Sequence, residues 1–135
     1  GVEPGAQVEP DRVGVAGDEL QRHLVEFPGP VGDVDDGAGA EPEAAAVVQK
    51  TRYSAFHDTK LDEILRDLDP DEVHVIGLCT DICVMHTTAD LRNRDYRVIV
   101  HRDGVETFNA PGHDNEDVNR WALSHIENIL GAKVV

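Results

Sequence analysis

From residue 44 onward, the chain alternates between short continuous apolar runs and stretches in which apolar residues recur at helical spacing. The continuous runs predict four strands, at residues 45–49, 73–76, 97–101 and 133–135. The helical spacing predicts three helices, at about residues 59–68, 82–94 and 118–130. The last of these carries an apolar stripe that includes Trp121 and Ile129. Strands that alternate with helices predict a three-layer α/β, Rossmann-like fold, in which helices cover both faces of a parallel sheet.

Turn and capping residues mark the ends of several of these elements. Gly77 breaks the apolar run of the second strand, and Asp103–Gly104 closes the third strand. Thr59 and Asp62 form a capping-box-like start for the first helix, which stops at Asp69–Pro70. These residues therefore predict element boundaries that are independent of the apolar pattern.

Residues 1–43 differ from the rest of the chain. They hold eight of the twelve glycines and five of the seven prolines, and Phe27 is their only aromatic residue. Only Asp18 to Phe27 has weak helical character, and no segment there predicts a strand. We therefore expect an irregular N-terminal segment, residues 1–43, followed by a folded domain at residues 44–135.

Charge and composition narrow the class of protein. The formal net charge of the 135-residue chain is −15, which argues against nucleic acid and anionic membrane surfaces as partners. The apolar runs are all shorter than the roughly 18 residues that a membrane span requires. Two cysteines are too few for a disulfide framework, so a reduced, cytoplasmic setting is expected. The chain begins with Gly1 and shows no signal peptide, so we expect a processed, trimmed or partial chain.

Cys83 is the strongest candidate for chemistry. It follows a predicted buried strand and a glycine, and it lies at the start of a predicted helix, where Thr80 and Asp81 are candidate N-caps. A thiol in the first turn of a helix faces unpaired backbone N–H groups and the positive end of the helix dipole, and both favour the nucleophilic thiolate. Ligands of α/β folds also bind at the carboxyl ends of strands.

Three motifs carry a resemblance to a known family. They are Lys50-Thr-Arg-Tyr-Ser-Ala-Phe56 with Thr59-x-Leu61, Gly77-Leu-Cys-Thr-Asp-Ile-Cys-Val84, and Thr87-Thr-Ala89. In this order and spacing, the chain resembles the nicotinamidase/isochorismatase family of cysteine hydrolases over about residues 47–135. The Tyr-Ser-Ala-Phe sequence is more similar to the nicotinamidase-like branch. The resemblance implies an isochorismatase-like fold for this part of the chain.

The resemblance also implies a mechanism. Members use a Cys–Asp–Lys triad, in which Cys83 would be the nucleophile and Lys50 the lysine. They carry a cis peptide before the nucleophile's turn, which would map to Leu78–Cys79, and the backbone amides of Cys79 and Cys83 would form the oxyanion hole. Independently of the resemblance, a lysine ammonium beside a thiol stabilises its thiolate.

Three further residues are predicted to bind substrate. Tyr53, Phe56 and Leu78 would line a pocket for a flat aromatic substrate, although Tyr53 and Phe56 fit a core position equally well. The predicted reaction is hydrolysis of a small carboxamide, with nicotinamide giving nicotinate and ammonia. The alternatives are an isochorismatase-like hydrolase of another substrate, or an inactive remnant that only oligomerises. The predicted partners are the small carboxamide and further copies of the chain, with neither nucleic acid nor membrane.

The front of the chain departs from the family pattern. Members carry an aspartate in an apolar-Asp-x-Gln-Asn-Asp-Phe type motif on their first strand, which residues 1–49 do not match; Asp35 and Asp36 lack a preceding apolar strand. Nicotinamidase-like members also use a divalent metal, which an Asp-x-His motif and further histidines bind. This motif is absent from the chain, and its histidines are scattered without the spacing of metal ligands. We therefore expect neither a metal site nor another identifiable cofactor. The front is expected to be truncated or replaced, for example by a frame shift.

Overall fold

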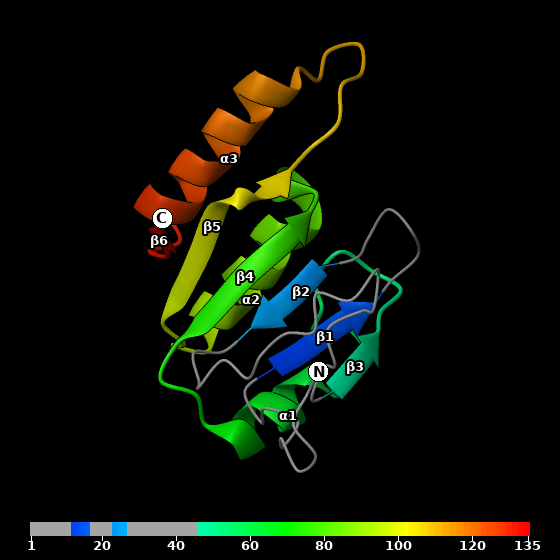
Figure 1. Cartoon of the computed structure of the whole chain (residues 1–135), viewed down its shortest axis with the longest axis vertical. Helices are drawn as coiled ribbons and strands as arrows, with labels where there is room; N and C mark the ends of the chain where they lie inside the picture. Colours follow the sequence, from blue (N-terminus) through cyan, green and yellow to red (C-terminus); the bar gives the residue numbers. More distant parts are fainter. Residues whose placement is uncertain (1–11, 17–22, 27–45) are drawn as a thin grey trace, which may run out of the picture.

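The structure is a computed structural model of the chain (Figure 1). It describes the backbone of residues 12–16, 23–26 and 46–135, and the side chains from residue 48 onward. Ten elements are described, in the order β1 (Arg12–Ala16), β2 (His23–Glu26), β3 (Ala46–Gln49), α1 (Leu61–Leu68), β4 (Val73–Leu78), η1 (Thr80–Val84), α2 (Met85–Asn93), β5 (Val98–Glu106), α3 (Asn115–Asn128) and β6 (Lys133–Val134).

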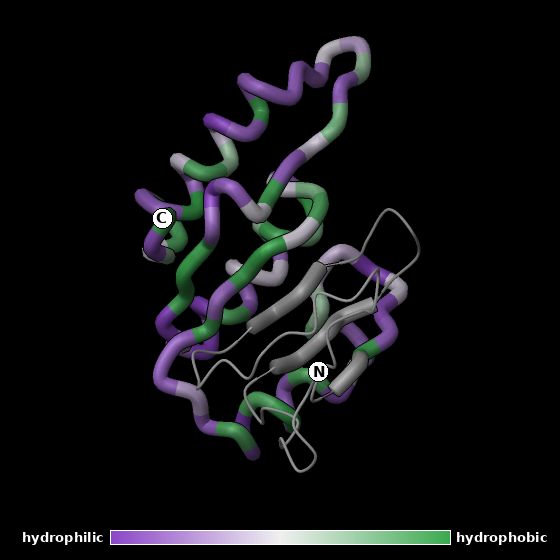
Figure 2. The backbone as a smooth tube through the Cα atoms, in the orientation of Figure 1, coloured by the Kyte–Doolittle hydropathy of each residue, from purple (hydrophilic) through white to green (hydrophobic). Residues whose placement is uncertain are grey.

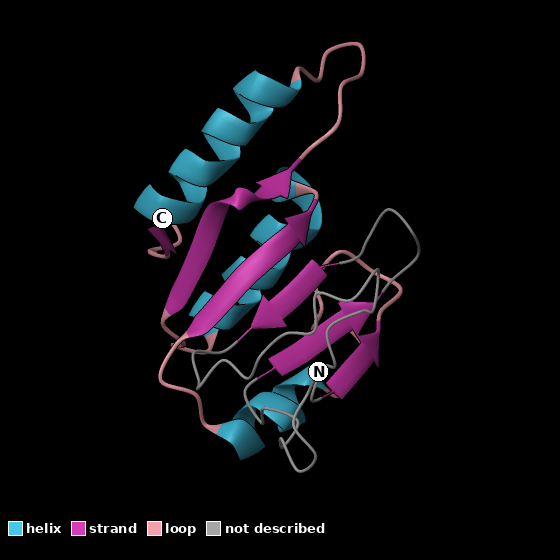
Figure 3. Cartoon of the chain, viewed as in Figure 1, coloured by secondary structure: helices cyan, strands magenta, loops and turns pink. Residues whose placement is uncertain are grey.

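One sheet organises the described residues, with strand order β3-β1-β2-β4-β5-β6 (Figure 3). β1 pairs in parallel with β3, and β4, β5 and β6 pair in parallel with one another. β2 is antiparallel to both of its neighbours, β1 and β4. Five strands therefore share one direction and only β2 is reversed, so the predicted parallel sheet is confirmed for all strands but this one.

The N-terminal segment corrects the expectation that no strand would form there. β1 and β2 both lie within residues 1–43 and are interior strands of the sheet, between the edge strand β3 and β4 (Figure 1). β2 also falls in the stretch that was expected to have weak helical character. Because these strands are short and lie among glycines and prolines, they lack the long apolar run that a strand prediction requires. The helical expectation for β2 was wrong, since pairing with β1 and β4 outweighs weak local propensity.

Two strands extend past the glycines that were expected to end them. β4 continues through Gly77, where φ is +142° and the register with β5 shifts between Val75 and Gly77. β5 continues through Gly104 to Glu106. A Cβ atom on Gly104 would lie 2.5 Å from Ile76 Cγ2, so the two strands approach closely because this residue is glycine. The glycines therefore mark an irregularity inside the paired strands rather than their ends.

The helices confirm the predicted positions and refine their boundaries. The helix predicted at 82–94 begins earlier, as the π-helical segment η1, and continues directly into α2. α1 ends at Leu68, and the C-cap Asp69 that follows has a left-handed conformation with φ +47°. α3 begins at Asp114, whose side chain accepts a hydrogen bond from the Asp117 amide. Trp121 and Ile129 were expected to face the core, but they are exposed, and Ala122, Leu123 and Ile126 are the buried residues of this helix.

The layers follow from the connections between strands. α2 passes behind β4 in Figure 1, α3 contacts α2, and the start of α1 contacts the end of α2 through Asp62 and Arg94. These contacts place the three helices along the same face of the sheet, as right-handed crossovers require. The α/β, Rossmann-like fold class is confirmed. The three described helices cover one face of the sheet, whereas the sequence predicted helices on both faces.

The core lies between the sheet and these helices. Apolar residues run along β4 and β5 (Figure 2), and Val73, Val75 and Val100 are fully buried. Leu65 of α1 and Leu91 of α2 close the core from the helical side. In the part of the chain that the structure describes, no helix is long and apolar enough to cross a membrane. The buried strands therefore form a fixed base for the turn that carries Cys83.

Candidate active site

Cys83 and Lys50 lie together in the interior. Lys50 follows the edge strand β3 and Cys83 lies in η1, yet the Lys50 Nζ donates to Cys83 Sγ over 3.3 Å. Only 4% of Lys50 and 1% of Cys83 are exposed. The Lys50 Nζ also donates to the backbone carbonyl of Arg52, 2.9 Å away. The fold therefore holds a lysine amine against a thiol that is distant in sequence, in a place from which water is largely excluded.

The turn before Cys83 has the geometry that the family resemblance implies. The Leu78–Cys79 peptide is cis, as expected. The Cys79 carbonyl accepts hydrogen bonds from the amides of Ile82 and Val84, at 3.1 and 3.2 Å. Burial raises the pKa of the Cys79 thiol above its ordinary value. A raised pKa leaves less thiolate at neutral pH, which fits a backbone role for Cys79 better than a nucleophilic one.

Asp81 does not cap the helix, so this expectation was wrong. Its carboxylate instead accepts hydrogen bonds from Thr107 Oγ1 at 2.7 Å and from His113 Nε2 at 2.9 Å. Burial alone would raise the pKa of Asp81, but the hydrogen bonds from His113 and Thr107 outweigh it and hold the pKa below its ordinary value. The same bond, with one from His113 to the Phe108 carbonyl, raises the pKa of His113. Asp81 thus links the helical turn that carries Cys83 to the loop between β5 and α3.

The three predicted substrate-binding residues lie in different environments. Tyr53 is 52% exposed, and its ring centroid lies 5.8 Å from that of His86. Leu78 is 45% exposed. Phe56 is buried in the core, with the Arg94 guanidinium carbon 4.1 Å from the centre of its ring. Burial under an arginine fits the core interpretation of Phe56 better than the pocket interpretation, while the substrate role of all three residues stays a prediction.

An open groove of about 430 Å³ lies beside Tyr53, between the loop after β3 and helix α2. Tyr53, Phe56, His86 and Arg94 are among its walls, but Lys50 and Cys83 are not. Arg52 also lines the groove, and its guanidinium donates a hydrogen bond to the Thr51 carbonyl. The groove therefore follows the loop surface, while the Lys50–Cys83 contact lies deeper.

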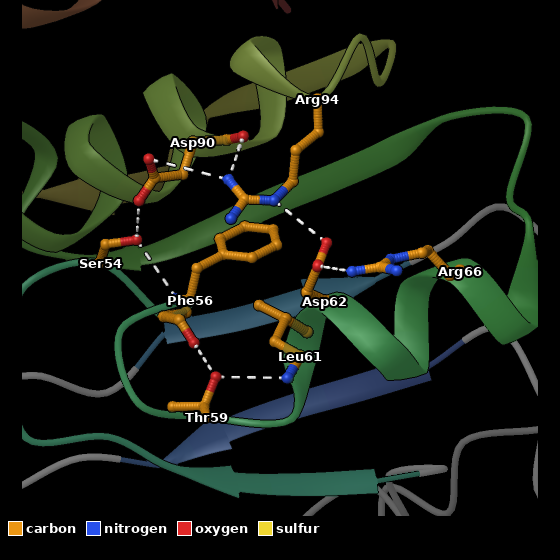
Figure 4. A network of polar contacts seen from close by, with 9 residues as sticks. Ser54, Phe56, Thr59, Leu61, Asp62, Arg66, Asp90 and Arg94 are labelled. Carbon is orange, nitrogen blue, oxygen red and sulfur yellow. Dashed lines mark hydrogen bonds and ion pairs between the residues drawn. The ribbon is translucent and has the colours of Figure 1, made fainter.

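A network of polar contacts holds this loop against α1 and α2 (Figure 4). Ser54 Oγ donates to the carboxylate of Asp90, and the Arg94 Nε donates to Asp62 at 3.1 Å. Asp62 also pairs with Arg66. Thr59 Oγ1 donates to the Ala55 carbonyl and accepts from the Leu61 amide. The predicted capping box was therefore only half right, because Thr59 serves the helix start while the Asp62 carboxylate pairs with arginines.

The described residues do not fit the divalent metal site that the resemblance implies. Among them, no group of three or more histidine, cysteine, aspartate or glutamate side chains is arranged to hold a metal ion. Two histidines expected to be scattered do meet, with His74 Nδ1 2.7 Å from His101 Nε2, and Glu72 lies 3.1 Å from the other ring nitrogen of His74. Asp35 and Asp36, which were weighed for the missing acid, lie outside the described residues.

The contacts of several residues at this site were not predicted from the sequence, although Thr87 belongs to one of the three motifs. Thr87 and Asp90 bond the loop, Arg94 covers Phe56, and His113 holds Asp81. Thr87 and Asp90 lie four and seven residues after Cys83, which is the spacing of one helical face. That spacing could have identified them as neighbours of the site. His113 belongs to a loop far along the chain, and no local pattern links it to Asp81.

The chain is similar in sequence to known proteins. The isochorismatase domain family matches residues 8–122. An uncharacterized isochorismatase family protein of Bacillus subtilis (strain 168), PncA, is 47% identical over 87 residues, which are 64% of this chain and 44% of that protein. Nicotinamidase of Escherichia coli (strain K12) is 42% identical over 69 residues, which are 47% of this chain and 32% of that protein.

A solved structure extends the likeness to the fold. The crystal structure of nicotinamidase PncA from Bacillus subtilis superposes with a TM-score of 0.60 and 42% identity, covering 67% of this chain and 46% of that one. The chain thus spans less than half the length of these relatives. The family match begins at residue 8, inside the predicted N-terminal segment, whose boundary near residue 43 stays a prediction. Since the match covers most of the sequence, the chain belongs to the isochorismatase family.

Proposed function

We propose that this chain is a cysteine amidohydrolase, or the part of one that carries the nucleophile, and that it cleaves a small carboxamide. The observation that carries the proposal is the buried contact of 3.3 Å between Lys50 Nζ and Cys83 Sγ. A thiol paired with a cation in a water-poor site is an activated nucleophile, and an acyl carbon is the electrophile that suits it.

The proposed reaction has two steps. In the first, the Cys83 thiolate attacks the carboxamide carbon, the C–N bond breaks, and the nitrogen leaves as ammonia after taking up a proton. In the second, water attacks the thioester, the C–S bond breaks, and the carboxylic acid leaves. Both steps pass through an oxyanion, which the backbone amides of Cys79 and Cys83 are proposed to stabilise. Lys50 holds the thiolate in place through its positive charge.

Nicotinamide is the first substrate to test, with nicotinate and ammonia as products. Its support is the likeness to proteins described as nicotinamidases, at 42% identity for the Escherichia coli protein and for the Bacillus subtilis structure. The exposed Tyr53 and Leu78 are proposed to bind its ring. The partners in this proposal are the carboxamide and further copies of the same chain.

Of the events in this reaction, proton transfer has the fewest candidate acid–base groups among the described residues. The family's acid–base aspartate would lie in the N-terminal segment, which also contains Asp35 and Asp36. A positioned acid–base group typically contributes about 10²–10⁴-fold to the rate. If this segment supplies no carboxylate near Cys83, we expect turnover to be lower than that of a complete family member by about this factor.

The test is ammonia release from nicotinamide by the whole chain, compared with Cys83→Ala and with Cys79→Ala. We expect the whole chain to release ammonia and Cys83→Ala to release none. Cys79→Ala should retain release, since its proposed contribution is a backbone amide. Equal release by the chain and by Cys83→Ala would contradict the proposal.

A second candidate is hydrolysis of another amide at the same cysteine. It is favoured by relatives of a different activity, such as a ureidoacrylate amidohydrolase of Methylobacterium radiotolerans that is 34% identical over 91 residues. Ammonia release from a panel of small amides, each with Cys83→Ala as the blank, separates the two. An inactive chain that only oligomerises would release none, and its mass in solution would exceed that of one copy.

A further inference from the structure

Two segments distant in sequence meet at the site, and they are joined at more than one point. The first segment runs from Lys50 to Phe56 after β3. The second is the continuous helical stretch of η1 and α2, which carries Cys83. Besides the Lys50–Cys83 contact, the Ala55 amide donates to Thr87 Oγ1 over 3.0 Å. The relative position of lysine and cysteine therefore depends on what holds these segments together.

The bond between Ala55 and Thr87 is fully buried. Both residues have 0% exposure, so water cannot replace Thr87 as the partner of the Ala55 amide. A buried N–H group that loses its partner has given up its bonds to water with nothing in exchange, which destabilises that arrangement. The segment would have to move to satisfy that group, and Lys50 lies only five residues before Ala55. The Thr87 hydroxyl thus holds the loop in a position where this amide is paired.

The two contacts lie side by side on the helical stretch. Cys83 and Thr87 are four residues apart, which places both side chains on the same face. One turn further, Ser54 Oγ donates to Asp90 on the same face (Figure 4). Lys50, Ala55 and Ser54 therefore meet Cys83, Thr87 and Asp90 as three neighbouring contacts, from the buried side outward.

We propose that Thr87 is a positioning residue, whose hydroxyl holds the Lys50 Nζ against the Cys83 Sγ. The effect of Thr87 on the reaction rate rests on the proposed function. Its effect on the position of Lys50 relative to Cys83 does not. Thr87 acts through the Ala55 amide and has no assigned contact with substrate. A displacement of Lys50 by about 1 Å would weaken its hold on the thiolate, and displacements of this size cost up to about 100-fold in rate.

The chain offers a matched control in the next residue. Thr88 is also fully buried, but among the described residues its hydroxyl has no hydrogen-bond partner. Thr87→Val and Thr88→Val make the same change of shape at adjacent, equally buried positions. Only the first removes a hydrogen-bond acceptor from a loop amide. Thr87→Ser restores the hydroxyl and should rescue the effect.

The experiment measures two quantities for each variant of the whole chain. The first is the ultraviolet thiolate absorbance at neutral pH, with Cys83→Ser subtracted to remove the signal of Cys79. Thr87→Val should lower this signal, while Thr87→Ser and Thr88→Val should leave it unchanged. The second is ammonia release from nicotinamide, where kcat should fall about 10- to 100-fold in Thr87→Val with a smaller change in KM.

The outcomes separate this inference from the proposed function. Loss of thiolate in Thr87→Val, with no ammonia released even by the unmodified chain, would support the positioning role and contradict the amidohydrolase. A folded Thr87→Val with unchanged thiolate and kcat would overturn the positioning role. Equal losses in Thr87→Val and Thr88→Val would also overturn it, because packing alone would then explain them.

A second variant keeps the inference testable if Thr87→Val fails to fold. Ser54→Ala removes the neighbouring contact with Asp90 on the partly buried side of the same interface. It should lower the Cys83 thiolate signal in the same direction, by less than Thr87→Val, because Ala55 remains bonded to Thr87. An unchanged signal in folded Ser54→Ala, together with an unfolded Thr87→Val, would overturn the positioning role.

Discussion

The interface between the loop after β3 and the η1–α2 helix has two ends that differ in their exposure to water. At the inner end, Lys50 meets Cys83 and both are almost fully buried. At the outer end, Arg94 meets Asp62, whose side chains are 35% and 31% exposed. Both ends contain a charged hydrogen bond at close to 3 Å, so distance alone does not distinguish them. The two ends differ in burial, because water screens the charges of Arg94 and Asp62 at the outer end and is excluded from Lys50 and Cys83 at the inner end.

The largest expected effect is at the inner end, in Lys50→Met. This change removes the positive charge beside the thiol while keeping a side chain of similar length. We expect kcat/KM for ammonia release from nicotinamide to fall at least about 100-fold, and the thiolate absorbance of Cys83 to fall with it. Lys60→Met is the control, since Lys60 is an exposed lysine of the same loop. A loss in both variants, or in neither, would show that burial is not what distinguishes the two ends.

The second effect concerns stability where the interface meets the core. Leu61 and Asp62 are neighbours at the start of α1, but Leu61 is fully buried. Leu61→Ala should lower the free energy of unfolding by about 2–5 kcal/mol, because it removes buried methyl groups and leaves a cavity. Denaturant unfolding measures this value. Ile129→Ala, at a position that is 70% exposed, should change stability far less, and a comparable loss there would contradict the assignment of the core.

A smaller effect, dependent on pH, is expected from the Asp81–His113 contact. The pKa of His113 is raised above its ordinary 6.5, so its share of stability is full below about pH 6.5 and is lost as pH rises through the folded pKa. The pKa of Asp81 is lowered below its ordinary 3.8, so its share is full above about pH 3.8 and is lost as pH falls through the folded pKa. The contact should therefore stabilise most between these two values.

His113→Gln tests this window, because glutamine can still donate a hydrogen bond but carries no charge. The stability difference between the chain and His113→Gln should be largest at about pH 5 and should shrink at pH 8. Denaturant unfolding at the two pH values measures it. A difference independent of pH would mean that the charge of His113 does not stabilise the turn.

The smallest effect is expected at the outer end, in Asp62→Asn. Asp62 pairs with both Arg66 and Arg94, and the hydrogen bond from Arg66 is the larger cause of its lowered pKa. These arginines are solvated, so the loss of stability should be several-fold smaller than that of Leu61→Ala and should diminish further in high salt. Thermal unfolding at low and high salt measures both. A loss as large as that of Leu61→Ala would remove the distinction between the two ends.

The C-terminal two thirds of the fold followed closely from local patterns. The strands β3, β4, β5 and β6 and the three α-helices lie where apolar periodicity predicted them, because each buries one face or one continuous run. The errors fell where pairing outweighs local preference. β2 is a strand between two partners despite weak helical character, and β5 passes through Gly104 because β4 packs closely there. The residues within a segment do not show which distant strand the segment will pair with.

The candidate site likewise has features that the sequence predicted and contacts that only the structure shows. Chemistry that depends on neighbouring residues, such as Cys83 at the start of a helical turn and Lys50 at the end of a strand, could be inferred from the chain alone. Contacts between distant segments could not, including those of Thr87 with Ala55, Arg94 with Phe56 and His113 with Asp81. Periodicity and composition report which residues seek burial or charge partners. The choice among several possible partners is made by the folded sheet, because it brings separate segments within hydrogen-bond distance and removes the water between them.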